Sequence, residues 1–368
     1  MIKKRLALIA LTLCLLAAVF SPVIVQAQGE LSVVESWAEA DFPMSLDFNL
    51  SARSDAPITD IRLCYSVDRT SFANVFTEAD VGFVSGTEVE TGWTLDMVML
   101  GGLPPGSSLE YWWKIEDADG DYLQTEPQRV LFDDERYEWD ALTEGQITLY
   151  CYQDDDDFVA DLMEAAQEAL ARLSEDTGAV LEKPVKLYIY SNSMDLQGAM
   201  IYPQEWTGGV AYTRHGIIAI GIAPPNATWG KRAIAHELAH LVVHQITLNP
   251  YNDLPTWLDE GLAMYTEGEL DDTHTAYLEN AAENDDFISV QSLCSPFSAY
   301  SYQAGLSYAQ SFSLVDYLLE SYGQPMMLEL LNTFAGGSSY DGALESVYGF
   351  DTDTLDGLWR QYAEEKYG

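Results

Sequence analysis

Two histidines and a distant glutamate are the residues whose types and spacing could do chemistry. His236 and His240 stand four positions apart in HELAH, so on an α-helix they share a face and their neutral imidazoles can reach one metal ion. Glu260 follows in PTWLDEG, where a carboxylate from a later helix could be the third ligand. Three protein ligands and one position for water are what catalytic zinc requires. The pattern predicts a zinc hydrolase.

The glutamate between the histidines has a different expected role. Glu237 can reach water in the open position of the metal, so we expect it to act as general base. The second helix offers other carboxylates. Glu267 lies seven residues after Glu260, on roughly the same face, and Asp259 lies about a quarter turn away. The spacing alone leaves all three acids as candidate ligands.

The histidine helix needs a core that holds it. We expect it to begin near Asn226 or Thr228 and to end near Ile246, with one face buried. That face carries Ile234, Leu238, Leu241 and Val242. His244, one turn further along the metal side, is expected to be a satisfied structural histidine. His215 and His274 are expected at the surface, His274 in an acidic loop.

Segments before and after this helix predict the rest of an α+β domain. Alternation predicts strands at 147–151 and 185–190 and a hairpin at 208–222 that turns near His215 and Gly216. Apolar residues three and four apart predict a helix from Phe158 to Leu173, and the aspartates at 154–157 complement its N-terminal dipole. After Ile288 we expect helices at about 302–322, 325–334, 340–348 and 352–367.

The first part of the chain has another character. From 31 to 139, short alternating segments are separated by Pro, Gly and Asp turns, which favours an all-β sandwich of immunoglobulin or fibronectin type. DADGD lacks the Glu that a calcium loop needs at its twelfth position, so we interpret it as a hairpin turn. Residues 133–140 are the expected linker. The predicted organisation is a leader at 1–27, a β-sandwich at 30–140 and a metal-dependent domain at 141–368.

The first residues and the overall charge restrict location and partners. Three basic residues, an apolar run from Leu6 to Phe20 and a small-residue site at Ala27 predict a signal peptide, hence a secreted or extracytoplasmic protein. No later stretch is long and apolar enough for a membrane span in the mature chain. The formal net charge of −42 disfavours nucleic acid and anionic lipid as partners.

The mature chain would keep three cysteines, an odd number for an exported protein. Cys151 with Cys294 is the preferred disulfide because both fall in the second predicted domain, which would leave Cys64 free. None of them neighbours a histidine. A thiolate metal site therefore has little support.

The third ligand distinguishes the known classes of such enzymes. A metzincin would have Gly and His where this chain has Val243 and Ile246. HELAH followed by Glu260 in WLDEG instead resembles the gluzincin zinc metallopeptidases, and the peptidase MA-like proteins in particular. The resemblance runs from about Ile147 to the carboxyl terminus, and only those two stretches are specific. It implies a zincin-like fold with a small mixed sheet plus helices.

The resemblance also implies roles for particular residues. Zinc would be held by His236, His240 and Glu260, and Gly261 leaves room beside the glutamate. Asp259 would orient a histidine N–H, and Glu267 would be a solvated or structural carboxylate. Thermolysin-like enzymes have an Asp where this chain has Met264, so that partner is absent.

Further implications concern the substrate. Tyr308 would donate to the oxyanion, with Tyr265, Tyr300 and Tyr302 as alternatives. Peptides or proteins would be substrates, with the 209–222 hairpin as a candidate edge strand for them. Endopeptidase and aminopeptidase action remain open alternatives, as does the oligomeric state. The alternative from another class is a catalytically silent zincin-fold binding or cell-surface interaction protein.

Overall fold

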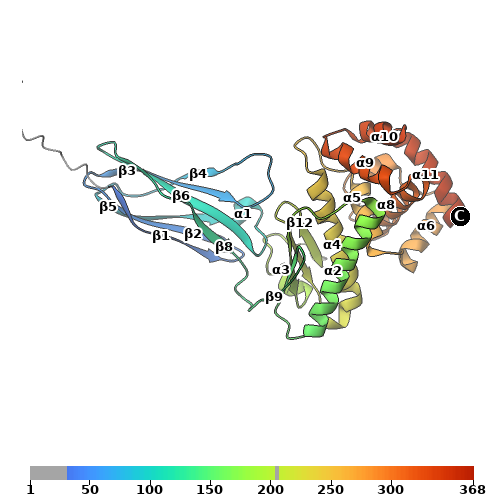
Figure 1. The fold of residues 1–368 in the computed structure, drawn as a ribbon, viewed down its shortest axis with the longest axis horizontal. Helices are drawn as coiled ribbons and strands as arrows, with labels where there is room; N and C mark the ends of the chain where they lie inside the picture. The colour runs from blue at the N-terminus through green and yellow to red at the C-terminus, as the bar shows by residue number, and fades with distance from the viewer. Residues whose placement is uncertain (1–30, 204–206) are drawn as a thin grey trace, which may run out of the picture.

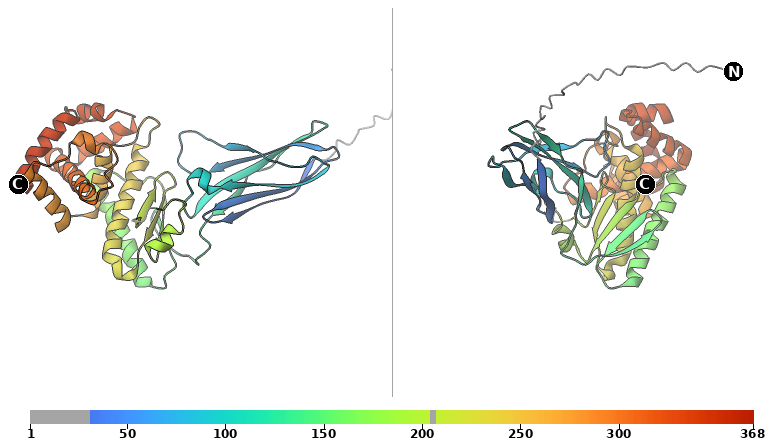
Figure 2. Two further views of the ribbon diagram at one scale, coloured as in Figure 1. Left: turned by 180° about the vertical axis from the view of Figure 1, so that it is seen from behind. Right: turned by 60° about the vertical axis from the view of Figure 1, so that its left-hand side comes forward.

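The computed structural model describes residues 31–203 and 207–368, so the predicted signal peptide at 1–27 lies outside the described residues. A β-rich region forms one end of the molecule, and helices form the other (Figure 1). Figure 2 shows a smaller sheet between these two parts. The arrangement is therefore an N-terminal β-rich region followed by an α+β region.

The β-rich region consists of antiparallel sheets around one core. One sheet has the order β1-β2-β5, and the other has the order β4-β3-β6-β7 with β8 also paired to β6. The strands are β1 (Ser32–Asp41), β2 (Ser45–Arg53), β3 (Ile58–Val67), β4 (Thr77–Asp80), β5 (Glu88–Asp96), β6 (Ser107–Asp117), β7 (Tyr122–Gln124) and β8 (Gln128–Phe132). Phe48 of β2 meets Tyr111 of β6 with ring centroids 5.0 Å apart, so the sheets face each other. The alternation predicted strands correctly because each has one buried face.

The DADGD segment is the hairpin turn that the sequence predicted. It connects β6 to β7, and Gly120 adopts φ +85° there. The buried carboxylate of Asp117 accepts hydrogen bonds from the backbone N–H groups of Asp119 and Asp121 and from the Ser54 hydroxyl. This carboxylate is thus satisfied by the turn itself.

The second region is built on a mixed sheet of order β12-β13-β11-β10-β9. Its strands are β9 (Asp140–Glu144), β10 (Ile147–Cys151), β11 (Val185–Tyr190), β12 (Gly209–Tyr212) and β13 (Ile217–Gly221). β10, β11 and β13 run parallel, and the outer strands β9 and β12 are antiparallel to their neighbours. The predicted strands and hairpin are confirmed, and Gly216 takes φ +64° in the turn.

Two long helices cover one face of this sheet. α2 (Asp156–Thr177) and α4 (Ala227–Thr247) contact each other and share a core with β10, β11 and β13. The side chain of Asp155 caps α2 by accepting from the backbone N–H of Phe158. The apolar face predicted for α2 is buried apart from Leu170, which is half-buried.

The opposite face of the sheet is covered by the segment that we expected to be a linker. Tyr137 and Trp139 pack against Tyr188 and Tyr190 of β11. Asp134 is fully buried and accepts hydrogen bonds from the Tyr190 hydroxyl at 2.9 Å and from Arg136 at 2.6 Å. The sequence predicted only a linker here, and the structure shows that these bonds and the four rings hold residues 133–140 on the sheet.

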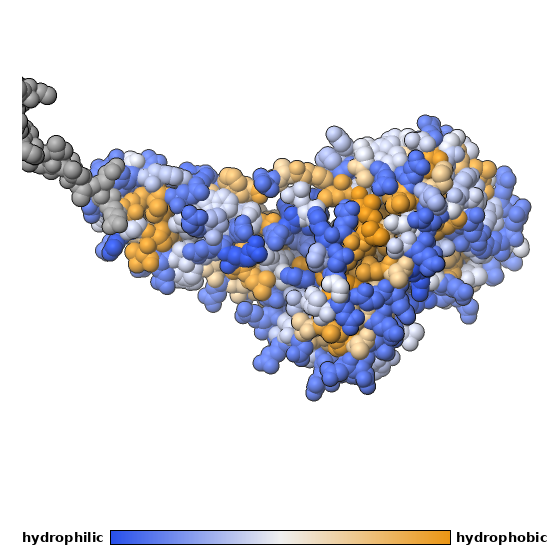
Figure 3. Space-filling view, in the orientation of Figure 1, coloured by the Kyte–Doolittle hydropathy of each residue, from blue (hydrophilic) through white to orange (hydrophobic). Residues whose placement is uncertain are grey.

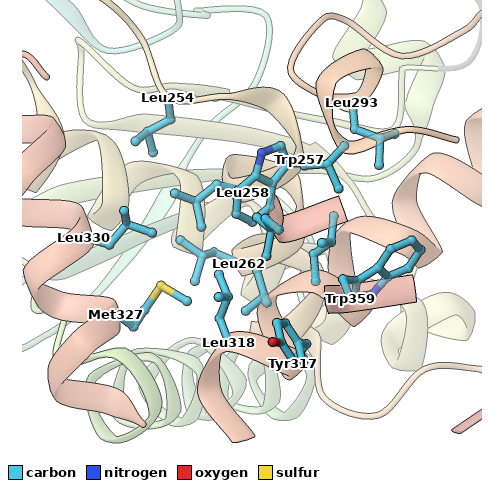
Figure 4. Packing of buried hydrophobic residues seen from close by; sticks show 14 of the residues in the cluster. Leu254, Trp257, Leu258, Leu262, Leu293, Tyr317, Leu318, Met327, Leu330 and Trp359 are labelled. Atoms are coloured by element: carbon cyan, nitrogen blue, oxygen red, sulfur yellow. The ribbon is translucent and has the colours of Figure 1, made fainter. Parts of the chain in front are cut away.

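The C-terminal part is a helical layer with its own core (Figure 4). Its long helices are α5 (Thr256–Glu267), α6 (Asp272–Asn284), α8 (Ser301–Tyr322), α9 (Gln324–Ala335), α10 (Tyr340–Tyr348) and α11 (Thr352–Tyr367). Trp257, Leu258 and Leu262 of α5 meet Leu318 of α8 and Trp359 of α11 there. The described residues also form the short helices α1 (Met97–Leu100), α3 (Ser193–Gln197), η1 (Pro224–Asn226) and α7 (Val290–Leu293).

One helix in this layer was missed. The residues around His274 form α6 rather than an acidic loop. Asp271 caps this helix through the backbone N–H of His274, and Leu278 and Ala281 are its only fully buried positions. With only two buried positions, the helical periodicity of apolar residues is too weak for the helix to be predicted from the sequence.

The disulfide prediction is wrong. Cys64, Cys151 and Cys294 are all free. Cys151 is buried between the sheet and α2, whereas Cys294 packs against the helical layer, so the two thiols belong to different cores. Burial raises the pKa of Cys294 to about 11, which keeps this thiol protonated at neutral pH.

The surface agrees with the composition. Hydrophilic residues cover most of the face shown in Figure 3, as a chain of net charge −42 requires. Among the helices of residues 31–203 and 207–368, none combines the length and apolar character needed to cross a bilayer.

Candidate metal centre

Helix α4 places both histidines opposite its buried face. Ile234, Leu238 and Leu241 are buried against the sheet, as predicted, and this fixes the rotation of the helix. His236 and His240 then lie on the other side with ring centroids 4.9 Å apart. The helix begins after Asn226, whose side chain makes no capping hydrogen bond.

Helix α5 brings the third predicted ligand to the histidines. The Nε2 atoms of His236 and His240 are 3.2 Å apart, and Glu260 Oε2 lies 3.4 Å from the first and 3.6 Å from the second. Ligand atoms of these three residues all lie within 4.8 Å of one another. α5 can approach this closely because Gly261 packs on the backbone of α8, where a Cβ would overlap the carbonyl oxygen of Ser311.

Two observations test whether these residues suit a metal ion. Glu260 Oε2 is buried and has no hydrogen-bond partner, although buried carboxylate oxygens are normally satisfied. The two Nε2 atoms face each other, so one of their lone pairs has no partner unless a cation or a proton lies between them. Two imidazole nitrogens and one carboxylate oxygen are a donor set that suits zinc. The residues present fit the ion.

The outer nitrogen of each imidazole is held by a carboxylate. Asp259 Oδ1 lies 2.9 Å from His240 Nδ1, which is the role that we expected for Asp259. Glu267 Oε1 lies 2.8 Å from His236 Nδ1, and its Oε2 accepts from Arg232 Nε at 3.0 Å. With Nδ1–H donating outward, each Nε2 lone pair is free to bind a cation.

Glu267 has a more definite role than the sequence indicated. Of the two expected possibilities, a solvated or a structural carboxylate, the structure supports the second, because its side chain is only 13% exposed and orients His236. The signal was its position two helical turns after Glu260, on the same face of α5. Glu267 thus fills the place left by the missing Asp at Met264.

His244 and His215 have different surroundings. His244 Nε2 lies 3.0 Å from Asp259 Oδ2, so this carboxylate joins His240 to His244, and the expectation of a satisfied structural histidine is confirmed. His215 is not a free surface residue. It is half-buried, and burial and the nearby Arg69 lower its pKa to about 4.

Electrostatics in the centre favour an ionised carboxylate. Burial opposes ionisation of Glu260, but the two histidines beside its carboxylate outweigh burial and lower its pKa to about 2. Burial likewise opposes the charge on His236, yet the carboxylates of Glu260 and Glu267 beside it raise its pKa to about 9. Burial raises the pKa of Glu237, which makes it a stronger base than an exposed glutamate.

A cavity of about 720 Å³ opens beside the centre. Its lining includes His236, Glu237 and Tyr308, together with Gly208 and Gly209 at the start of β12. Gly209 lets β12 approach, because a Cβ there would lie 3.1 Å from Glu237 Oε1. His274, expected at the surface, also lines this cavity and is bonded to Asp271.

Among the four tyrosines considered as oxyanion donors, only Tyr308 lines this cavity. Tyr265 faces a separate cavity beside Phe312, Tyr300 is 77% exposed, and the hydroxyl of Tyr302 donates to Asn280. Burial, followed by the charges of Glu260 and Glu237, raises the pKa of Tyr308, so its hydroxyl keeps its proton.

The helix-borne histidine pair, the glutamate on the following helix and the mixed sheet beside them define a centre of the HExxH type. The chain belongs to the Peptidase MA superfamily, whose sequence profile matches residues 165–365. The resemblance seen in HELAH and WLDEG is thereby confirmed. No curated protein matches the chain.

Solved structures give only distant likenesses. A family 56 carbohydrate-binding module that binds β-1,3-glucan is 14% identical, with 26% of this chain and 95% of that chain covered and a TM-score of 0.17. A family 76 glycoside hydrolase from Bacteroides thetaiotaomicron is 8% identical, with 91% and 64% covered and a TM-score of 0.17. At these TM-scores, neither structure indicates a fold or a function for this chain.

Proposed function

We propose that the chain is a secreted zinc-dependent peptidase. The observation that carries the proposal is the convergence of His236 Nε2, His240 Nε2 and Glu260 Oε2 beside a cavity that Glu237 also lines. Membership of the Peptidase MA superfamily supports metallopeptidase activity and a protein or peptide substrate. Export rests on the leader predicted at 1–27.

Zinc, when bound, would supply a Lewis acid that polarises the scissile carbonyl and acidifies water. Glu237 would take the proton from the attacking water and pass it to the leaving amine. The hydroxyl of Tyr308 would donate a hydrogen bond to the developing oxyanion. Asp259 and Glu267 would keep the two imidazoles in the tautomer that binds metal.

Substrate binding would use the free edge of β12. This strand is the outermost of its sheet and starts at the cavity, so an extended peptide could pair with its backbone. The β-rich region at 30–140 would be an immunoglobulin- or fibronectin-like sandwich in front of the peptidase region at 141–368. Its two facing antiparallel sheets support that assignment.

The test combines metal analysis with cleavage of a peptide library. We expect one zinc per chain and chelator-sensitive cleavage that Glu237→Gln lowers at least a thousandfold while zinc content is unchanged. Glu168→Gln, an exposed glutamate on α2, removes the same charge and should cleave like wild type. Unchanged cleavage in Glu237→Gln would overturn the mechanism. Bound zinc without any cleavage would favour the alternative, a silent binding protein. Free and blocked peptides separate aminopeptidase from endopeptidase action.

A further inference from the structure

Basic side chains gather at one place on this acidic molecule. The chain has 17 Lys and Arg against 59 Asp and Glu, yet Arg69, Lys183, Lys186 and Arg214 line a single cavity of about 290 Å³. They come from the loop after β3, from residues 183–186 where the chain enters β11, and from the turn between β12 and β13. The cavity therefore lies where the β-rich region meets the mixed sheet.

These four cations form no close ion pair with a carboxylate of the described residues. No ion pair within 4.0 Å joins any of them to an acid among residues 31–203 and 207–368. Lys186 Nζ donates instead to the Gly106 carbonyl at 2.7 Å, and Lys183 Nζ donates to Thr70 Oγ1 at 3.4 Å. Eight other cations do pair with acids: Arg62, Lys114, Arg129, Arg136, Lys231, Arg232, Arg360 and Lys366.

Hydrogen bonding around the cavity is also incomplete. Ser108 Oγ and His215 Nδ1 belong to lining residues, and both atoms are buried without a hydrogen-bond partner in the described part of the chain. Asp68 is the one acid in the lining. Four positive charges close together repel one another, and unsatisfied polar atoms add to the cost, so the site gains most from an anion with several acceptor oxygens.

We propose that this cavity binds a small, multiply charged oxyanion of the phosphate class. Two guanidinium groups from separate segments can each offer paired N–H donors, and two ammonium groups add charge. The volume is small for a whole organic ligand and suits a phosphate group with little attached to it. Binding would join the two regions, because Arg69 and Ser108 lie on one and Lys183 and Arg214 on the other.

The existing contact across this junction supports the bridging role. The backbone N–H of Thr70 donates to the carbonyl of Arg214 at 2.7 Å, so the two loops already meet at the rim of the cavity. An anion held between their side chains would add charge-assisted hydrogen bonds at the same point. It would also screen the repulsion between Arg69 and Arg214. Anion binding at this cavity requires no peptidase activity.

The test is calorimetric titration of the zinc-loaded full chain with inorganic phosphate at constant ionic strength. We expect saturable one-to-one binding that weakens as sodium chloride is added. Each exposed cation removed should weaken phosphate binding roughly fivefold, so the double variant Lys183→Gln/Arg214→Gln should bind phosphate at least twentyfold more weakly than wild type. Both side chains are exposed, so the variant should fold. Arg53→Gln, which removes an exposed charge from β2 outside the cavity, should bind within twofold of wild type.

Other titrants identify the source of the phosphate group. Tighter binding of glycerol phosphate than of inorganic phosphate would support a phosphate carried by a larger molecule, and the reverse order would support the free ion. Phosphate binding that is unchanged in the double variant would place the anion elsewhere, for example at the metal centre, and would overturn the proposal. Absence of saturable binding at millimolar phosphate, or binding only of an acidic peptide without phosphate, would overturn it as well.

Discussion

Glu267 offers a sharp test of how the metal centre is held. Its Oε1 lies 2.8 Å from His236 Nδ1 and its Oε2 lies 3.0 Å from Arg232 Nε, with the side chain only 13% exposed. Glu267→Gln keeps the shape and one acceptor oxygen but removes the negative charge. A hydrogen bond to an ionised group is worth about 1–1.5 kcal/mol more than a neutral one.

That difference corresponds to roughly tenfold in an equilibrium constant. We therefore expect Glu267→Gln to bind zinc about tenfold more weakly than wild type, and Glu267→Ala to approach a hundredfold. The assay is competition with a chromophoric chelator near neutral pH. With saturating zinc, peptide cleavage by Glu267→Gln should recover to near the wild-type rate, because the role assigned to this carboxylate is to hold His236 for zinc.

A matched control separates orientation from overall charge. Glu269→Gln removes the same charge two residues further along, from an exposed side chain, and should leave zinc affinity unchanged. If Glu267→Gln binds zinc within twofold of wild type, the carboxylate does not orient the imidazole and the reasoning fails. Equal losses in both variants would show that net charge, and not the hydrogen bond, sets the affinity.

Three further outcomes follow from the same contacts. Gly261→Ala should lower the free energy of unfolding by about 2 kcal/mol in urea melts, because the added Cβ would overlap the backbone of α8. The control Gly357→Ala, in open space on α11, should raise the free energy of unfolding by up to about 1 kcal/mol. Equal effects of the two substitutions would contradict the close packing of Gly261. Tyr308→Phe should lower kcat about a hundredfold with KM within twofold, and Tyr302→Phe should change neither; a loss confined to KM would refute the donor role. Zinc affinity should rise at least tenfold per pH unit up to about pH 9, because zinc must displace a proton from His236, whose pKa is raised to about 9. A zinc dissociation constant that does not change with pH across the neutral range, measured by competition titration, would refute that shift.

The sequence predicted much of the centre because its pattern is local. The spacing of His236 and His240 is a helical spacing, and the apolar positions on the other side of α4 indicate which face of the helix is buried. The strand at 147–151 alternates, the strand at 185–190 is apolar or aromatic apart from Lys186, and turn residues flank both, so they too could be predicted. In each case a short stretch of chain holds all the information.

What could not be predicted depends on contacts between distant segments. Glu267 meets His236 because α5 packs across α4, and its position two turns after Glu260 indicates the face of α5 but not the histidine that it contacts. The cysteines were paired by domain membership, whereas the structure assigns Cys151 and Cys294 to separate cores. His215 was expected at the surface because it lies at a hairpin turn, yet the junction of the two regions half-buries it.

The segment at 133–140 has a practical consequence for anyone who shortens the chain. A chain that begins at residue 141 would lose Trp139 and the buried carboxylate of Asp134, and would leave Tyr188 and Tyr190 of β11 facing water. Uncovered aromatic sheet faces promote aggregation. We therefore expect an isolated peptidase half to remain soluble when it starts at Asp133 and to precipitate when it starts eight residues later.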